Sequence, residues 1–231
     1  MTREQIPGLF VTGTDTEVGK TYIAAKVTRA LCAAGCKVGV YKPAASGCRL
    51  EAGELVSDDA VALWDAAGQP GELNQVCPQR FAAPLAPPLA ARAEGREVSA
   101  ELLRTGLDYW RARSDFLIVE GAGGLLSPLG DEDYVADLAA DFGFPLIIVG
   151  DNSLGAINRL LSALVVAATF RDGLTIAGVI LNETRESDAD PSAASNLSEL
   201  RARAVPPVLG LVHFGGELPP GIDWRALASA E

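Results

Sequence analysis

The sequence predicts an α/β fold: a single doubly wound, mostly parallel β-sheet flanked by helices. Two observations lead to this prediction. Short apolar segments rich in β-branched residues alternate with longer segments whose apolar residues recur at helical spacing. The chain has 231 residues, of which 48% are hydrophobic and 21% charged, which suits one large buried core. We find no internal repeat and no dividing boundary, so residues 1–231 are expected to form one domain.

The first part of the chain predicts two strands and two helices. Residues 9–11 form the first strand and lead into a loop that contains glycine. Residues 20–34 follow as a helix with one apolar face, and Gly35 is suited to end it. Residues 37–42 form a short second strand, and residues 58–67 a second helix that begins with capping side chains.

The middle of the chain is less regular. Residues 69–88 are rich in proline and alanine, which favours irregular structure. Ser99 then opens a third helix, and residues 115–120 form a buried strand. The apolar face of this third helix comprises Leu102, Leu103, Leu107 and Trp110.

The last third of the chain repeats the alternation. Strands are expected at residues 145–151, 176–182 and 208–212, with helices at residues 155–171 and 193–204 between them. The glycine- and proline-rich C-terminal stretch is not assigned to an element. Ligands of doubly wound sheets bind beyond the carboxyl ends of the strands, so functional side chains are expected there.

The charge balance excludes several classes of partner. Lysine and arginine total 19 and aspartate and glutamate 30, a net charge of −11. Non-specific nucleic-acid binding needs a basic surface, so we expect no nucleic-acid partner. No apolar run is long enough to span a bilayer, and residues 1–8 lack a secretory signal pattern. We therefore expect a cytoplasmic protein with no membrane partner.

The cysteines and the single histidine argue against a zinc site and a covalent nucleophile. Cys32, Cys36, Cys48 and Cys77 lack the paired spacing of zinc ligands and are expected to be reduced. His213 has no obvious serine or cysteine partner.

The clearest functional signal is a phosphate-binding loop. The segment GTDTEVGKT, residues 13–21, follows the first strand and opens the first helix. Gly19 lets a phosphate approach the backbone N–H groups, Lys20 can reach the outer phosphates, and the Thr21 hydroxyl suits Mg²⁺. Thr14 stands where the first glycine is usual. The alternative is a glycine turn before a capped helix. We expect a nucleoside triphosphate, ATP or another, with Mg²⁺.

Three more polar residues fall at the same end of the predicted sheet. Asp59 begins the second helix, and Glu120 ends a strand and precedes the small residues 121–124. Lys42 ends the second strand near Ser46, and a second lysine beside the phosphates suggests an anionic substrate or intermediate. Asp59 could instead be a helix cap, and Glu120 and Lys42 could be solvated strand ends.

Four motifs in this order, GTDTEVGKT, YKPAASG, VEGAGG and DNSLGAINR, resemble those of the dethiobiotin synthetases of biotin biosynthesis. The resemblance spans residues 9–182, and Lys42-Pro43 with Ser46-Gly47 separates it from a bare phosphate-binding loop. It implies a fold of the P-loop NTPase type and a ligase. In this family ATP drives ring closure of 7,8-diaminononanoate with carbon dioxide, through a carbamate and a carbamic–phosphoric anhydride.

The resemblance also implies roles for individual residues. Lys20, Lys42 and Thr16 would be catalytic, and Thr21, Asp59 and Glu120 would hold Mg²⁺. Substrate contacts would include Thr16, Lys42 and Ser46. The implied nucleotide-binding positions are Glu17, Val18, Gly19, Lys20, Thr21, Tyr22, Asp59, Gly121, Ala122, Gly123, Gly124 and Asn182.

The predicted helix after residue 154 has a further implied role. In the family its start belongs to a homodimer interface and binds the substrate's carboxylate in the partner's site. The implied positions are Leu154, Gly155, Ala156, Ile157 and Asn158. The apolar stripe of the same helix is equally consistent with packing on the sheet.

The nucleobase end departs from the family pattern. Asn182 matches the position that hydrogen-bonds the purine. The family commonly has glycine, two residues and proline after the last strand, whereas here Gly210 is followed by Leu211, Val212 and His213. Phe214 could lie against a base or in the core. The sequence therefore does not tell which nucleobase binds. It also suggests no role for Asp15.

Two other classes of function stay open. One is an ATPase of the partitioning type, whose hydrolysis switches a dimer. Such proteins usually carry a second lysine inside the loop, where this chain has Asp15 and Glu17. The other is a related amidoligase, which would need a glutaminase that this sequence does not contain.

Overall fold

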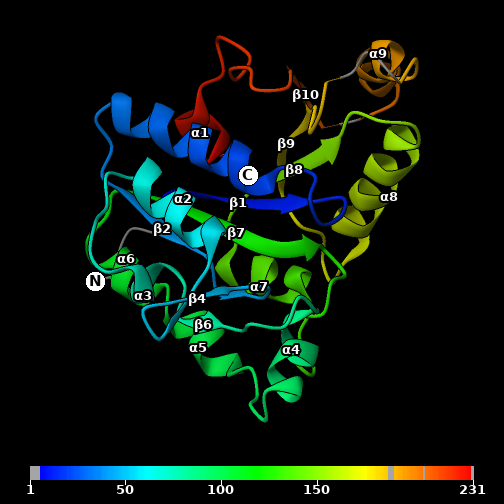
Figure 1. Ribbon diagram of the computed structural model, residues 1–231. Helices are drawn as coiled ribbons and strands as arrows, with labels where there is room; N and C mark the ends of the chain where they lie inside the picture. Colours follow the sequence, from blue (N-terminus) through cyan, green and yellow to red (C-terminus); the bar gives the residue numbers. More distant parts are fainter. Residues whose placement is uncertain (1–5, 187–189, 205, 230–231) are drawn as a thin grey trace.

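The computed structural model describes residues 6–186, 190–204 and 206–229. Its centre is a six-stranded sheet in the order β10-β9-β8-β1-β7-β2, with every neighbouring pair parallel (Figure 1). The strands are β1 (Gly8–Gly13), β2 (Val38–Tyr41), β7 (Phe116–Gly124), β8 (Leu146–Asp151), β9 (Ile176–Asn182) and β10 (Val208–Val212). The strand order reverses direction at β1, which is the doubly wound arrangement that the sequence predicts.

Helices cover both faces of this sheet. Figure 1 shows α1 and α10 on one side of β1 and α7 on the other. The longer helices are α1 (Lys20–Ala33), α2 (Asp58–Ala66), α7 (Val135–Phe142), α8 (Ala156–Thr169) and α9 (Ala193–Arg203). The shorter ones are α3 (Leu73–Val76), α4 (Pro87–Ala93), α5 (Ala100–Thr105), α6 (Asp108–Arg111) and α10 (Trp224–Leu227). Because both faces are covered, the central strands are buried along their length, as in other parallel sheets.

The predicted helix that opens at Ser99 is divided into α5 and α6. The Tyr41 hydroxyl contacts the carbonyl oxygens of Leu102 and Leu103 at 2.9 and 3.1 Å, close to the point where α5 ends. A Cβ at Gly106 would lie 2.3 Å from that hydroxyl, so the chain passes Tyr41 without a side chain. Leu102 is accordingly turned outward, with 37% of its surface exposed, instead of sharing the apolar face.

Several short elements lie outside the sequence-based prediction. The stretch 69–88 contains α3 and the strand β6 (Gln79–Arg80), which pairs with β3 (Ala44–Ala45). A hairpin of β4 (Arg49–Glu51) and β5 (Glu54–Val56) precedes α2. These elements bring residues 80–87 toward the loop that follows β2. No helix within the described ranges has the length and apolar character that crossing a membrane requires.

Candidate active site

The phosphate-binding loop joins β1 to α1. Gly19 is the N-cap of α1 and has a positive φ of 88°, a conformation that glycine adopts without strain. A Cβ at this position would lie 2.2 Å from Asn182 Nδ2, so the loop and β9 meet only because Gly19 lacks a side chain. Lys20 lies in the first turn, nearly buried, and its Nζ donates to the backbone oxygen of Asp15 at 2.7 Å. The lysine therefore folds back over the loop that would surround a phosphate.

A second cluster joins three elements beside this loop. Thr21 Oγ1 lies 2.8 Å from both Asp59 Oδ1 and Glu120 Oε1. Lys42 Nζ lies 2.8 Å from Asp59 Oδ2, contacts Glu120 Oε1 and is 3.3 Å from the oxygen of Gly121. The residues that the sequence placed at the ends of separate strands and helices are therefore in direct contact.

The two lysines have opposite pKa shifts. Burial alone would lower the pKa of Lys42, but attraction to Glu120 and Asp59 outweighs it and raises this pKa above its ordinary value. Burial, together with repulsion from Lys42, lowers the pKa of Lys20. The charge of Lys42 lowers the pKa of Asp59, whereas burial raises that of Glu120 against the opposing effect of Lys42. The cluster thus holds an ammonium group permanently charged next to a carboxylate that is desolvated.

The donor set fits Mg²⁺. Glu120 Oε2 is buried and has no hydrogen-bond partner, which leaves one carboxylate oxygen to be satisfied. The Thr21 hydroxyl and the Asp59 carboxylate stand beside it. Hydroxyl and carboxylate oxygens are the ligands that a hard cation prefers.

A cavity of about 700 Å³ opens above these residues. Ten of the predicted site residues line it: Thr16, Glu17, Gly19, Lys20, Thr21, Lys42, Ser46, Asp59, Ala122 and Gly123. The predicted residues that do not line it are Val18, Tyr22, Glu120, Gly121, Gly124, Asn182 and the group from Leu154 to Asn158.

Val18, Asn182 and Tyr22 make contacts outside the cavity. The Asn182 Nδ2 donates to the oxygen of Val18 at 3.1 Å, while its Oδ1 is buried without a partner. Tyr22 points away from the cavity, and its hydroxyl donates to the oxygen of Gly216 at 2.8 Å. The side chain of Tyr22, the residue after Thr21, is therefore hydrogen-bonded to the segment that follows β10. The sequence did not predict this contact.

The start of α8 lies apart from this cavity. Gly155 is its N-cap with a φ of 87°, and Leu154 is 77% exposed. Two of the five predicted amides are already engaged within the chain: Leu154 N–H donates to Asp190 Oδ2 at 2.8 Å, and Ala156 N–H to the oxygen of Ser153 at 3.0 Å. A helix leaves the N–H groups of its first turn without partners inside the helix.

Comparison with known proteins places this geometry in a family. A family model described as an AAA domain matches residues 7–220. An ATP-dependent dethiobiotin synthetase BioD from Rhodopirellula baltica is 44% identical over 203 residues, which cover 83% of this chain and 78% of the relative. One from Anaeromyxobacter dehalogenans is 49% identical over 193 residues, covering 84% of this chain and 83% of the relative. The chain belongs to the dethiobiotin synthetase family.

Solved structures support the fold of this dethiobiotin synthetase family member. A ParA family ATPase from Chlorobium tepidum superposes with a TM-score of 0.54 at 14% identity, over 96% of this chain and 87% of that one. A putative plasmid partition protein from Borrelia burgdorferi, bound to AMPPNP, gives 0.57 at 11% identity, over 98% and 96%. At such low identity the likeness concerns the P-loop NTPase fold alone.

The cavity of this family member also contains residues for which the sequence predicted no role in the site. They are Ala45, Gly47, Pro84, Leu85, Ala86, Pro87, Ser127 and Pro128. The four from Pro84 to Pro87 lie in the stretch predicted to be irregular and reach the site because β6 pairs with β3. A sequence signal exists in the repeated prolines, which mark a fixed turn before α4, but it does not indicate what that turn faces.

Proposed function

We propose that this chain catalyses the ATP- and Mg²⁺-dependent carboxylation and ring closure of 7,8-diaminononanoate with carbon dioxide, which gives dethiobiotin. Membership of the family makes the chain an ATP-dependent ligase of biotin biosynthesis. The observation that carries the finer proposal is the pair Lys20 and Lys42, which line one cavity together with Thr21. Two ammonium groups suit a reaction between two anions, a triphosphate and a carbamate.

The proposed reaction proceeds in three steps. One amine of the diamine attacks carbon dioxide and loses a proton, which gives a carbamate. A carbamate oxygen then attacks the γ-phosphorus of ATP, the bond to the departing ADP oxygen breaks, and a carbamic–phosphoric anhydride forms. The second amine attacks the carbonyl carbon, expels inorganic phosphate and loses a proton to close the cyclic urea. Alignment and charge screening suffice for this sequence, without a covalent protein nucleophile.

Each predicted residue has a place in this scheme. Lys42 and Lys20 would screen the carbamate and the transferring phosphoryl group, and Thr16 and Ser46 would hydrogen-bond the carbamate or the diamine end. Both of these hydroxyl residues line the cavity together with the lysines. Glu17 would face the nucleotide or a cationic amine.

Thr21, Asp59 and Glu120 would hold Mg²⁺, directly or through water. When bound, the ion neutralises charge on the β- and γ-phosphates. The unpartnered Glu120 Oε2 and the contacts of the Thr21 hydroxyl support this assignment. The nucleotide contacts that we propose besides these are Val18, Gly19, the backbone N–H of Tyr22, Gly121, Ala122, Gly123, Gly124 and, at the purine, Asn182.

We further propose a homodimer in which the start of α8 binds the carboxylate of the substrate held by the partner subunit. A helix N-terminus attracts a carboxylate through its N–H groups and its dipole. The positions from Leu154 to Asn158 carry this role. Leu154, Val165 and Leu126 are 77%, 62% and 52% exposed, which supports an apolar contact surface along α8. The four cysteines are free, which suits the cytoplasm as the proposed compartment.

Phosphate release and dethiobiotin formation by the purified protein test the proposal. We expect ATP turnover with Mg²⁺ to require both the diamine and bicarbonate. The control omits one component at a time. Equal ATP hydrolysis with and without the diamine would favour the switch ATPase, and a requirement for glutamine or ammonia would favour the amidoligase.

A further inference from the structure

The sheet order sets the direction in which a nucleotide leaves the phosphate-binding loop. The loop follows β1, and β7 and β2 lie on one side of it with Glu120 and Lys42. The γ-phosphate has to lie on that side, because the Thr21 cluster and Lys42 are there. The nucleoside therefore extends toward the other side, where β9 and β10 end. Asn182, with its buried and unpartnered Oδ1, marks that side.

The chain that follows β10 runs from the carboxyl ends of β9 and β10 back to α1. Val212 pairs with Asn182 in the sheet, and Gly216 N–H donates to the oxygen of His213 at 2.7 Å in the turn that follows. We call residues 213–217 the return segment. It contains Phe214, of which 55% is exposed, and ends above the first turns of α1.

Two side chains of α1 hold the return segment. The Tyr22 hydroxyl donates to the oxygen of Gly216 at 2.8 Å, and Lys26 Nζ lies 2.8 Å from Glu217 Oε1. The Lys26 ammonium also sits 5.0 Å from the centre of the Tyr22 ring, so the two contacts support each other. Tyr22 directly follows Thr21. The residue next to the metal and phosphate ligands is thus bonded to the segment beside Asn182.

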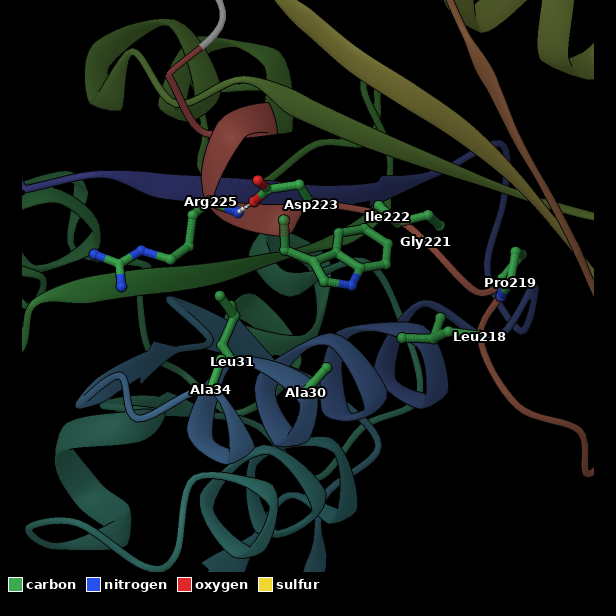
Figure 2. A pocket seen from close by; sticks show the side chains of 10 residues that line it. Ala30, Leu31, Ala34, Leu218, Pro219, Gly221, Ile222, Asp223 and Arg225 are labelled. Carbon is green, nitrogen blue, oxygen red and sulfur yellow. Dashed lines mark hydrogen bonds between the residues drawn. The ribbon is translucent and has the colours of Figure 1, made fainter.

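Beyond the return segment the chain is anchored by apolar packing. Figure 2 shows Leu218 beside α1. Leu218 and Trp224 line a cavity of about 550 Å³ together with Ala30 and Leu31 of α1. A Cβ at Gly210 would lie 2.6 Å from Pro219, so the chain packs closely on β10. The downstream end is therefore fixed independently of Tyr22 and Lys26, which act on the return segment itself.

We propose that Tyr22 and Lys26 are positioning residues, which hold the return segment in place as one wall of the nucleoside subsite. The inference rests on the proposed function only in taking ATP as the nucleotide. If this wall is already ordered before ATP binds, none of the binding free energy is used to order it. When the hydroxyl of Tyr22 is removed, the return segment occupies other positions for part of the time. The dissociation constant of ATP then rises in proportion to the loss of the competent form.

The test compares ligands with and without a nucleoside. Binding of Mg-ATP and of Mg-tripolyphosphate is measured by calorimetry for wild type, Tyr22→Phe and Glu217→Gln, with no diamine present. The phenylalanine keeps the ring under Lys26 and removes only the hydroxyl. Tyr109→Phe on α6 and Glu199→Gln on α9, whose carboxylate pairs with Arg203 at 2.6 Å, are the matched controls. Circular dichroism and thermal unfolding check that every variant is folded.

In Tyr22→Phe and in Glu217→Gln we expect the Kd of ATP to rise about fivefold, which is the effect of losing one hydrogen bond. The Kd of tripolyphosphate should stay unchanged in both variants. Unchanged ATP binding would overturn the proposal. An equal loss for both ligands would also overturn it, since the variants would then act on the phosphate-binding loop. Dethiobiotin formation does not enter the measurement. A protein that binds ATP and makes no dethiobiotin would contradict the proposed function alone.

Discussion

Lys42 is the residue on which the proposed chemistry depends most. Only 3% of it is exposed, and Asp59 and Glu120 both face its ammonium group. Such a group keeps its charge at every physiological pH, since its pKa is raised. It is thus a fixed positive charge, available to the carbamate and the phosphoryl group of the proposed reaction, and it does not serve as a base at neutral pH.

Lys42→Ala should separate catalysis from nucleotide binding. We expect the Kd of Mg-ATP to change little, because the loop N–H groups, Lys20 and Thr21 remain, while turnover falls by about two to three orders of magnitude or more. Calorimetry and a dethiobiotin assay measure the two effects. Lys37→Ala, at the exposed residue just before β2, is the control. Turnover at the wild-type rate in Lys42→Ala would remove this lysine from the mechanism.

Lys42→Met should change how stability depends on pH. The variant leaves Glu120 buried without its cation, which we expect to cost about 3–5 kcal/mol near neutral pH. Burial already raises the pKa of Glu120 from 4.5, and without Lys42 it rises further. A carboxyl group whose pKa is higher in the folded than in the unfolded state binds more protons in the folded state. The folded protein therefore loses stability as the pH rises above 4.5, the ordinary pKa of the group.

The stability deficit of Lys42→Met relative to wild type should therefore shrink as the pH falls toward 4.5. Urea unfolding at about pH 5 and about pH 8 measures it. A deficit of the same size at both values would mean that Glu120 stays ionised without Lys42.

At the scale of elements, the junction of β1 and α1 depends on one missing side chain. Gly19 turns the backbone with a positive φ and allows Asn182 of β9 to touch the loop. Gly35, at the other end of α1, has a φ of 89° and no atom within 4 Å of its Cβ position. The two glycines share a conformation and differ in their surroundings.

Gly19→Ala and Gly35→Ala therefore form a matched pair. Both should lose about 1–2 kcal/mol of stability from the left-handed backbone. Gly19→Ala must in addition displace Asn182, so we expect the Kd of Mg-ATP to rise more than about tenfold in that variant alone. Thermal unfolding and calorimetry give the two quantities. A similar loss of ATP binding in Gly35→Ala would show that backbone strain, and not the contact with Asn182, is responsible.

Elements set by local sequence were predictable, and those set by distant contacts were not. The bounds of β9 and β10 agree with the prediction, and α1 differs by one residue, because each has its own periodicity and its own end signal. The break between α5 and α6 depends on Tyr41, far away in the sequence. The helix α7 was missed although its apolar residues have helical spacing, since eight residues make too short a window.

The same distinction holds within the site. Lys20 and Thr21 follow from a local motif, and Lys42, Asp59 and Glu120 from strand ends. The direction of Tyr22 could not be predicted, because Gly216 comes near it only when β10 has joined the sheet.

At the scale of the whole molecule, the sheet separates three tasks along one edge. The proposed site of phosphoryl transfer lies between β1 and β2, the proposed nucleoside side lies at β9 and β10, and the start of α8 follows β8 between them. A second cavity of about 470 Å³ lies between the residues of α8 and the loops after β1 and β7. It shares Ser127 and Pro128 with the first cavity. A partner docked on α8 would therefore lie next to the wall of the substrate site.

Val165→Glu tests this arrangement, because Val165 is exposed on α8 and has no proposed contact with substrate. We expect sedimentation to show dimers for the wild type and monomers for the variant. The KM for the diamine should rise by at least about tenfold, since the carboxylate loses a receptor with several hydrogen bonds, while ATP binding stays unchanged. Leu50→Glu, on the hairpin before α2 and 72% exposed, controls for an added surface charge. A monomer with unchanged diamine affinity would show that each site is complete within one chain, and the role proposed for α8 would then be wrong.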